Sequence, residues 1–168
     1  VMALHAPKNA AHLSDAILYA LRRDTRTTLA SLPDVSEGLE NVLYEKARSC
    51  TDYPAFLAAV KTKRYTLARL RRIAMHALLG VDKAFVARHP APRYLRVLGV
   101  RRDALALLSA LSECASLPVV SGYQDYAALN GIAKEQFDLD LFAGELSSMA
   151  APAPEAASSE FSRPLLIV

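Results

Sequence analysis

The stretch TLARLRRIAMHALLG, residues 66–80, decides the fold class because it carries a complete helix signal. Thr is a favoured residue at the start of a helix, and Gly is a favoured residue just beyond its end. At about 100° per residue, the apolar side chains of this stretch share one face of the helix. They are Leu67, Leu70, Ile73, Ala74, Ala77 and Leu78. A helix with such a face must bury it, so the stretch predicts a helical core.

The residues before this helix predict more helices. Residues 14–31 begin with polar residues that can cap a helix and continue with an apolar stripe at helical spacing. Residues 33–49 carry a second helical pattern. Asp52 is a good cap for a short third helix, which has Pro54 near its first turn. Residues 1–82 are therefore predicted to form a basic helical region.

Beyond Gly80 the hydrophobic pattern changes. Residues 94–98 and 117–120 alternate like short strands, and residues 103–114 between them have a helical leucine pattern. A strand, a helix and a strand in this order predict a βαβ unit with a parallel strand pair. The chain is therefore expected to be mainly α with a small parallel β-sheet (α+β), a helical bundle followed by a βαβ lobe.

The remaining residues complete this expected organisation. Helical patterns return at 123–130 and 137–149, so residues 83–150 are expected to form a small βαβ and helical lobe. Residues 151–160 are rich in Pro, Ala and Ser and predict a linker. Residues 161–168 end in an apolar, β-prone run, which predicts a terminal strand added to the small sheet.

Charge is distributed unevenly along the chain. Residues 1–110 hold 18 of the 20 Lys and Arg residues but only 9 of the 17 acids, and residues 61–102 hold twelve basic residues and a single acid, Asp82. A basic segment of this kind indicates a surface for nucleic acid or another polyanion. The alternative is a solvated face that another domain partly covers. No run approaches the roughly 18 apolar residues that span a bilayer, and the first residues lack a signal-peptide core, so we expect a cytoplasmic protein without membrane contact.

The basic segment supplies candidate RNA-binding residues on one side of the helix at 66–79. They are Lys61, Lys63, Arg64, Tyr65, Arg69, Arg72 and His76. Cations beside a tyrosine fit phosphate contacts plus one ring on which a base stacks. The alternative is an exposed basic helix whose arginines pair with acids elsewhere in the protein. Arg101 and Arg102, just before a predicted helix start, are weaker candidates, since a phosphate could dock there, but a solvated pair also explains them.

Motifs of catalysis and cofactor binding are absent from the sequence. It has no GxGxxG, no GKS or GKT loop, no HxGH and no GxSxG, and its histidines lack metal-ligand spacing. Asp138 and Asp140 would point apart on a helix, so they do not form an acid–base pair. We therefore expect no catalytic residue, cofactor or metal in this chain.

Three blocks of sequence resemble a known family. PDVSEGLEN (33–41), KTKRYTLARLRRI (61–73) and PRYLRVLGV (92–100) are similar, in order and approximate separation, to the C-terminal half of the bacterial tRNA(Met) cytidine acetate ligases. The resemblance covers about residues 14–150. It implies an ATP-dependent parent enzyme that acetylates N4 of the wobble cytidine of elongator tRNA(Met). ATP and Mg would bind an N-terminal nucleotidyltransferase-like catalytic domain upstream of Val1.

The resemblance leaves two hypotheses for this chain. In the first it is a tRNA-binding and scaffold module, with tRNA and its own N-terminal catalytic domain as partners. In the second its basic face docks on that catalytic domain. Glu37 and Gly38 of the first block match the family and are candidate docking residues. A stand-alone enzyme is a third hypothesis, but the sequence shows no nucleophile–base or phosphate-cradle signature that would support it.

Overall fold

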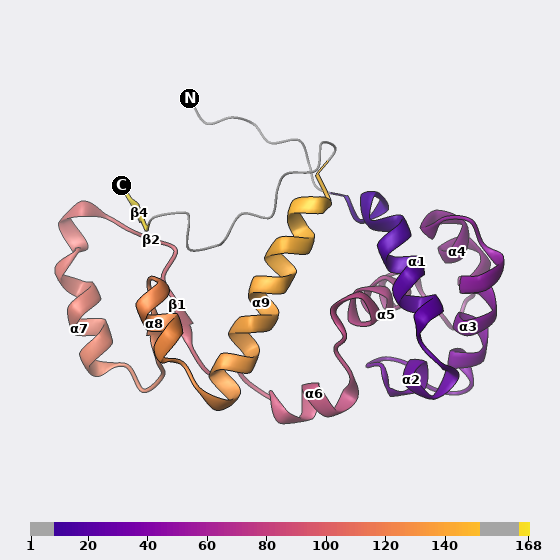
Figure 1. Cartoon of the computed structure of the whole chain (residues 1–168), viewed down its shortest axis with the longest axis horizontal. Coiled ribbons are helices and arrows are strands. Elements are labelled where there is room, and N and C mark those ends of the chain that lie inside the picture. The colour runs from indigo at the N-terminus through magenta and orange to yellow at the C-terminus, as the bar shows by residue number, and fades with distance from the viewer. Residues whose placement is uncertain (1–8, 152–164) are drawn as a thin grey trace. The chain divides into compact units, whose positions relative to one another are not determined.

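The computed structural model describes residues 9–151 and 165–168. These residues divide into two compact units, which are described separately. Unit 1 comprises residues 9–87 and 146–151, and unit 2 comprises residues 88–145 and 165–168. Figure 1 labels most of their helices and strands. The predicted fold class is confirmed, since the chain is mainly helical with short parallel strand pairs.

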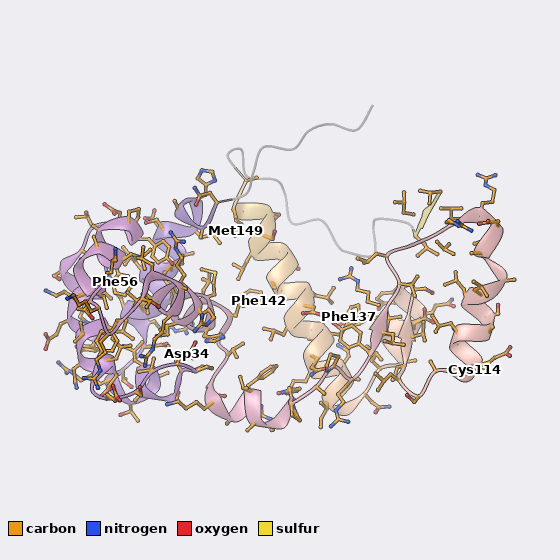
Figure 2. All side chains as sticks on the ribbon, turned by 180° about the vertical axis from the view of Figure 1, so that it is seen from behind. Asp34, Phe56, Cys114, Phe137, Phe142 and Met149 are labelled. Carbon is orange, nitrogen blue, oxygen red and sulfur yellow. The ribbon has the colours of Figure 1, made fainter. Side chains whose placement is uncertain are left out.

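Unit 1 is a cluster of helices around one apolar core. Its elements are η1 (Ala10–Leu13), α1 (Ser14–Arg23), α2 (Arg26–Ser31), α3 (Leu39–Ser49), α4 (Tyr53–Val60) and α5 (Leu67–Leu79). Helix α1 packs against α3, α4 and α5, while α2 packs against α3. Ile17, Leu43, Phe56 and Ile73 are almost fully buried, and Figure 2 marks Phe56 inside this cluster. Each comes from a different helix, so the core joins all four of these helices.

Helix ends in unit 1 follow the predicted caps at α4 and α5. The Asp52 carboxylate accepts a hydrogen bond from Ala55 N at 2.7 Å. Thr66 is the N-cap of α5, and Gly80 ends that helix in a left-handed conformation with φ 70°. Only glycine adopts this conformation without steric cost, so α5 stops where the sequence predicts.

Two predicted helices of unit 1 have different bounds in the structure. The single helix expected over residues 14–31 is wrong, because the chain is extended at Asp24 and Thr25 caps a new helix by accepting from Thr28 N at 3.1 Å. The second helix begins at Leu39 instead of near Pro33. Left-handed backbone at Glu37 and Gly38 cannot continue a right-handed helix, which explains this late start.

Unit 2 contains the predicted βαβ unit. Its elements are β1 (Leu95–Arg96), β2 (Gly99–Val100), η2 (Arg102–Ala104), α7 (Ala106–Cys114), β3 (Val119–Val120), α8 (Tyr123–Ala128) and β4 (Leu166–Ile167). Strands β1 and β3 pair in parallel, with Leu95 opposite Val119. Helix α6 (Lys83–Arg88), which the sequence analysis missed, and helix α9 (Gly131–Met149) each have residues in both units.

The C-terminal strand differs from its prediction. Strand β4 pairs in parallel with β2, so it forms a second two-stranded ladder instead of extending the β1–β3 pair. Gly99 allows this pairing, because a Cβ at its position would lie 3.0 Å from the Leu166 carbonyl oxygen. Helix α9 also begins earlier than expected, at Gly131. Residues 152–160 of the predicted linker and residues 161–164 lie outside the described residues.

The core of unit 2 is small. Val120, Leu129 and Phe137 are buried, and the rings of Tyr94 and Tyr126 lie 4.8 Å and 5.3 Å from that of Phe137. None of the residues of α7, all of which the structure describes, is buried. Unit 2 therefore leaves leucine side chains on its surface that a larger core would cover.

Candidate nucleic-acid interface

The predicted basic block lies in unit 1, on the loop between α4 and α5 and on the outer side of α5. Lys61, Lys63 and Arg64 are exposed. The loop is fixed by two hydrogen bonds: Thr62 N donates to Tyr65 O at 3.2 Å, and Tyr65 N donates to Thr62 Oγ1 at 3.0 Å. These contacts hold the lysines of the loop close to the first turn of α5.

Tyr65 does not offer the exposed ring that the sequence analysis expected. Its side chain is 9% exposed and belongs to the core of unit 1. The guanidinium carbons of Arg64 and Arg69 lie 5.8 Å and 5.4 Å from the centroid of its ring, within the range of cation–π attraction. A tyrosine ring that packs into the core can still attract cations that lie over its face. A base could stack on this ring only after the side chain left the core.

The arginines of the block contact the loop of residues 33–38, which lies between α2 and α3. Arg64 pairs with the Glu37 carboxylate, and Arg72 Nε pairs with the Asp34 carboxylate at 2.8 Å. Arg69 donates to the Asp34 carbonyl oxygen at 2.9 Å and to Ser36 Oγ at 2.8 Å. The arginines therefore lie together, as predicted from the sequence, but each of them already contacts a protein group of unit 1.

The same loop has an unusual backbone. Asp34, Glu37 and Gly38 have φ angles of 65°, 61° and 82°. Left-handed backbone costs energy at residues other than glycine, so other contacts must hold the loop. One of these contacts comes from α6, where Lys83 Nζ donates to the carbonyl oxygens of Ala30 at 2.7 Å and Val35 at 2.9 Å.

The two predicted docking residues both lie in this loop. The Glu37 carboxylate is used by Arg64, and Gly38 is the N-cap of α3. A Cβ at Gly38 would meet no atom within 4 Å, so backbone conformation alone accounts for glycine at this position. Whether either residue contacts another domain stays a prediction.

His76, another candidate RNA-binding residue, is only partly exposed. Its side chain is half-buried, and within the described part of the chain its buried Nδ1 has no hydrogen-bond partner. Burial lowers the pKa of His76 below its ordinary value of 6.5, while the nearby Asp34 carboxylate opposes this change. Burial therefore favours the neutral form of the His76 ring.

Three cations of α5 and of the loop before it remain available to a ligand. Lys61, Lys63 and Arg71 are exposed, and their side chains make no hydrogen bond or ion pair with any residue that the structure describes. Arg71 was missed by the sequence analysis because it lies between the apolar face of α5 and the stripe of Arg69 and Arg72. Its charge and its place in the sequence between Arg69 and Arg72 could have identified it as a candidate.

Arg101 and Arg102 belong to unit 2. Arg101 pairs with Asp103 at 2.8 Å, and the backbone N–H of Arg102 donates to Val168 O at 2.7 Å. Both residues lie at a helix start, as predicted, since Arg101 is the N-cap of η2 and Arg102 is its first residue; η2 is short, and α7 begins only at Ala106. A backbone N–H that already has a partner is not free to hold a phosphate.

The acids of α9 have structural partners. The Tyr126 hydroxyl donates to Asp138 at 2.9 Å, and Lys134 also pairs with Asp138. Asp140 accepts a hydrogen bond from the Tyr94 hydroxyl, and burial raises the pKa of Asp140 above its ordinary value. Each carboxylate fixes an aromatic residue of the unit 2 core, so neither acts with the other as an acid–base pair.

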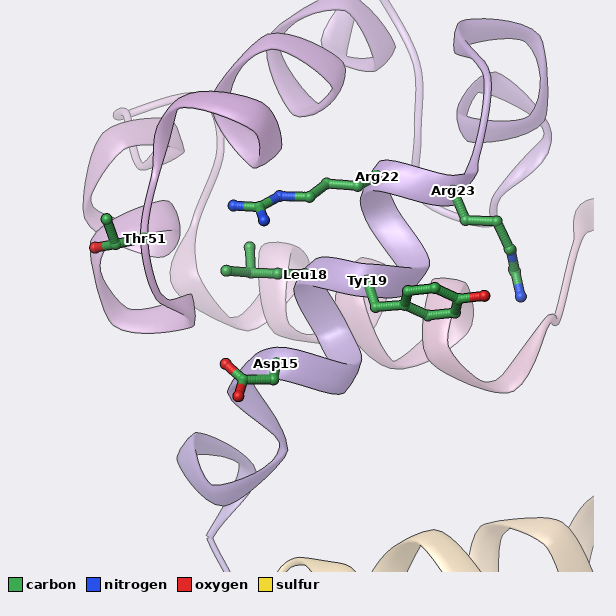
Figure 3. A pocket seen from close by; sticks show the side chains of 6 residues that line it. All are labelled: Asp15, Leu18, Tyr19, Arg22, Arg23 and Thr51. Carbon is green, nitrogen blue, oxygen red and sulfur yellow. The ribbon is translucent and has the colours of Figure 1, made fainter.

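A hollow of about 360 Å³ lies beside α1 (Figure 3). The Arg22 guanidinium there donates to the carbonyl oxygens of Ala47 and Cys50, both at 2.7 Å. Tyr19 and Arg23 point away from Arg22 in Figure 3, so the polar groups do not converge on one ligand. Arg22 instead satisfies carbonyl groups at the end of α3.

Residues 9–151 and 165–168 contain no group of three or more His, Cys, Asp or Glu side chains that could hold a metal ion. In the same residues, no helix has both the length and the apolar character needed to cross a membrane.

Comparison with known proteins identifies the family of this chain. Residues 2–161 match the HIGH Nucleotidyl Transferase family, and the chain belongs to this family. Among its relatives, the tRNA(Met) cytidine acetate ligase of Thermoanaerobacter sp. (strain X514) is 31% identical over 95% of this chain and 39% of the relative. The corresponding ligase of Thermotoga maritima is 31% identical over 86% of this chain and 37% of the relative. The predicted resemblance to these ligases is therefore confirmed.

The fold of this chain is also similar to that of a solved structure. The crystal structure of Thermotoga maritima TmcAL bound with alpha-thio ATP matches with a TM-score of 0.83 and 29% sequence identity. The match covers 97% of this chain and 43% of that chain. The chain thus spans about two fifths of the length of the curated relatives that it matches.

Proposed function

We propose that this chain is the tRNA-binding and scaffold module of an ATP-dependent ligase that acetylates N4 of the wobble cytidine of elongator tRNA(Met). The observation that carries the proposal is the group of exposed cations in α5 and the loop before it, Lys61, Lys63 and Arg71, which make no hydrogen bond or ion pair with the described residues, in a chain whose relatives are tRNA(Met) cytidine acetate ligases. A tRNA substrate implies a cytoplasmic location, which is part of the proposal.

Phosphates of the tRNA backbone are the groups that these cations would bind. Lysine and arginine on a protein surface neutralise phosphates and release counterions, which gives affinity without reading base sequence. Such contacts position the RNA, while the choice of the wobble cytidine and its acetylation fall to other parts of the ligase. The lack of an HxGH motif and of a phosphate-binding loop in this sequence supports that division, with ATP and Mg bound elsewhere in the parent enzyme.

Docking on another part of the parent enzyme is the second candidate function. It is favoured by the contacts of Arg64, Arg69 and Arg72, which already bind protein groups instead of facing solvent alone. Under this hypothesis the basic face meets acidic protein surface, and added RNA does not compete with that contact.

The two functions are separated by the salt dependence of tRNA binding. Lys61→Ser combined with Lys63→Ser should weaken binding to many RNAs alike and reduce the slope of log affinity against log salt by somewhat less than one unit for each contact removed. Lys46→Ser is the matched control, since Lys46 is also an exposed lysine of unit 1. The measurement is filter retention of elongator tRNA(Met) across a salt series. Unchanged affinity and slope in the double variant would favour docking.

A further inference from the structure

Two exposed ion pairs join α5 and its preceding loop to the loop of residues 33–38. In the first, Arg64 and Glu37 have side chains that are 59% and 55% exposed. In the second, Arg72 and Asp34 have side chains that are 57% and 36% exposed. Both carboxylates therefore bind guanidinium groups at the surface of the protein. An RNA phosphate could reach the same guanidinium groups.

Carboxylates and phosphates bind a guanidinium through the same planar arrangement of N–H donors. Ion pairs exposed to solvent contribute little to stability, so a phosphate can replace a carboxylate at small cost to the fold. Arg69 differs from its neighbours, because it donates to a carbonyl oxygen and a hydroxyl and has no carboxylate to exchange.

The loop keeps its shape through contacts that do not involve these carboxylates. Lys83 binds the carbonyl oxygens of Ala30 and Val35, and Arg69 binds the carbonyl oxygen of Asp34. Contacts from α5 and α6 therefore hold the loop that contains the left-handed residues Asp34 and Glu37. Loss of either ion pair would free a guanidinium without releasing the loop.

We propose that Glu37 and Asp34 are built-in competitors of RNA phosphates for Arg64 and Arg72. This inference rests on the proposed function, in which unit 1 binds tRNA. Each carboxylate lowers the affinity of unit 1 for isolated phosphates. The surface then favours a ligand that presents phosphates to both guanidinium groups at once, as the backbone of a folded RNA does.

The test is a double-mutant cycle on tRNA affinity. Glu37→Gln should raise the affinity for elongator tRNA(Met) by about 5-fold. An exposed ion pair contributes less than about 1.4 kcal/mol, and that free energy corresponds to a tenfold change in affinity. The gain should vanish when Arg64→Gln is also present, since no guanidinium is then released. Asp34→Asn with Arg72→Gln is the second cycle, and asparagine tolerates the left-handed backbone at this position.

Glu45→Gln is the matched control for overall charge. Glu45 is also an exposed acid of unit 1 that pairs with an arginine, Arg26, at 3.8 Å. It should raise affinity by less than 2-fold, in both the wild-type and the Arg64→Gln backgrounds. Circular dichroism checks that every variant is folded.

The outcomes distinguish this inference from the proposed function. Gains in both cycles that depend on Arg64 and Arg72 support competition. If the wild-type protein binds tRNA with a clear salt dependence, but Glu37→Gln gains no more than Glu45→Gln, competition is overturned and tRNA binding stands. If the wild-type protein does not bind tRNA at all, the proposed function fails and this inference fails with it.

Discussion

The two units of the chain differ in how much apolar surface they bury. In unit 1, α1, α3, α4 and α5 each contribute side chains that are almost fully buried, such as Ile17 and Phe56. In unit 2 the buried core is Val120, Leu129 and Phe137, and Leu98 and Leu107 are 70% and 66% exposed. Figure 2 marks Phe56 among the helices of unit 1 and Cys114, which is exposed, at the end of α7.

This difference shows where the stability and the charged surface of the chain are located. Apolar burial is the main source of folding free energy, so unit 1 is expected to hold most of it. The surface of unit 1 carries exposed cations such as Lys61 and Lys63. Helix α7 instead exposes apolar side chains such as Leu107 and Leu111, which the small core of unit 2 does not cover.

The largest expected effect compares one buried and one exposed aliphatic side chain. Ile73→Ala in α5 should lower the free energy of unfolding by about 2–5 kcal/mol, because it removes buried methyl groups and leaves a cavity. Leu107→Ala in α7 should change it by less than about 0.5 kcal/mol, because that side chain is exposed. Urea unfolding followed by circular dichroism measures both. A cost at Leu107 as large as that at Ile73 would mean that α7 packs within the chain.

A smaller effect is expected from backbone strain in the loop before α3. Gly38→Ala should cost about 1–2 kcal/mol, because alanine must adopt the left-handed conformation there. Gly122→Ala in unit 2 is the control, since its φ of −161° is extended and its Cβ would also meet no atom within 4 Å. Thermal unfolding of the two variants compares them. Equal losses would contradict a specific role for left-handed backbone at Gly38.

The smallest of these stability effects concerns the arginine contacts. Arg69→Ala should cost about 1 kcal/mol, because it removes hydrogen bonds to the Asp34 carbonyl oxygen and to Ser36. Lys61→Ala, which removes an exposed cation without a partner in the described residues, should stay within about 0.5 kcal/mol of the wild type. Urea unfolding of both variants decides the matter. If Arg69→Ala were also neutral, the arginine stripe would have no part in holding the loop.

Local signals explain which elements of the fold could be predicted from the sequence. Helix α5 was predicted at its observed bounds because Thr66 and Gly80 fix its ends through their own backbone and side-chain chemistry. The break at Asp24 was missed because the apolar spacing continues across it. The pairing of β4 with β2 was missed because it depends on Gly99 allowing a distant segment to approach.

The candidate site was predicted less completely, for a related reason. Charge spacing located the basic block, but it could not show which cations already have partners. Glu37 lies 27 residues before Arg64, and Asp34 lies 38 residues before Arg72. Such contacts arise only from the packing of α5 beside the loop of residues 33–38. Tyr65 was misjudged because a tyrosine in a polar loop gives no sign of whether its ring packs inward.

The most direct test of tRNA binding by unit 1 is chemical modification of lysines with and without elongator tRNA(Met), read by mass spectrometry. Lys61 and Lys63 should be protected when the tRNA is bound. Lys46, an exposed lysine of α3, and Lys134, which pairs with Asp138 in unit 2, should react equally in both samples. Protection confined to Lys134, or unchanged reactivity at Lys61 and Lys63 under conditions where tRNA is bound, would contradict the location of the RNA surface on unit 1.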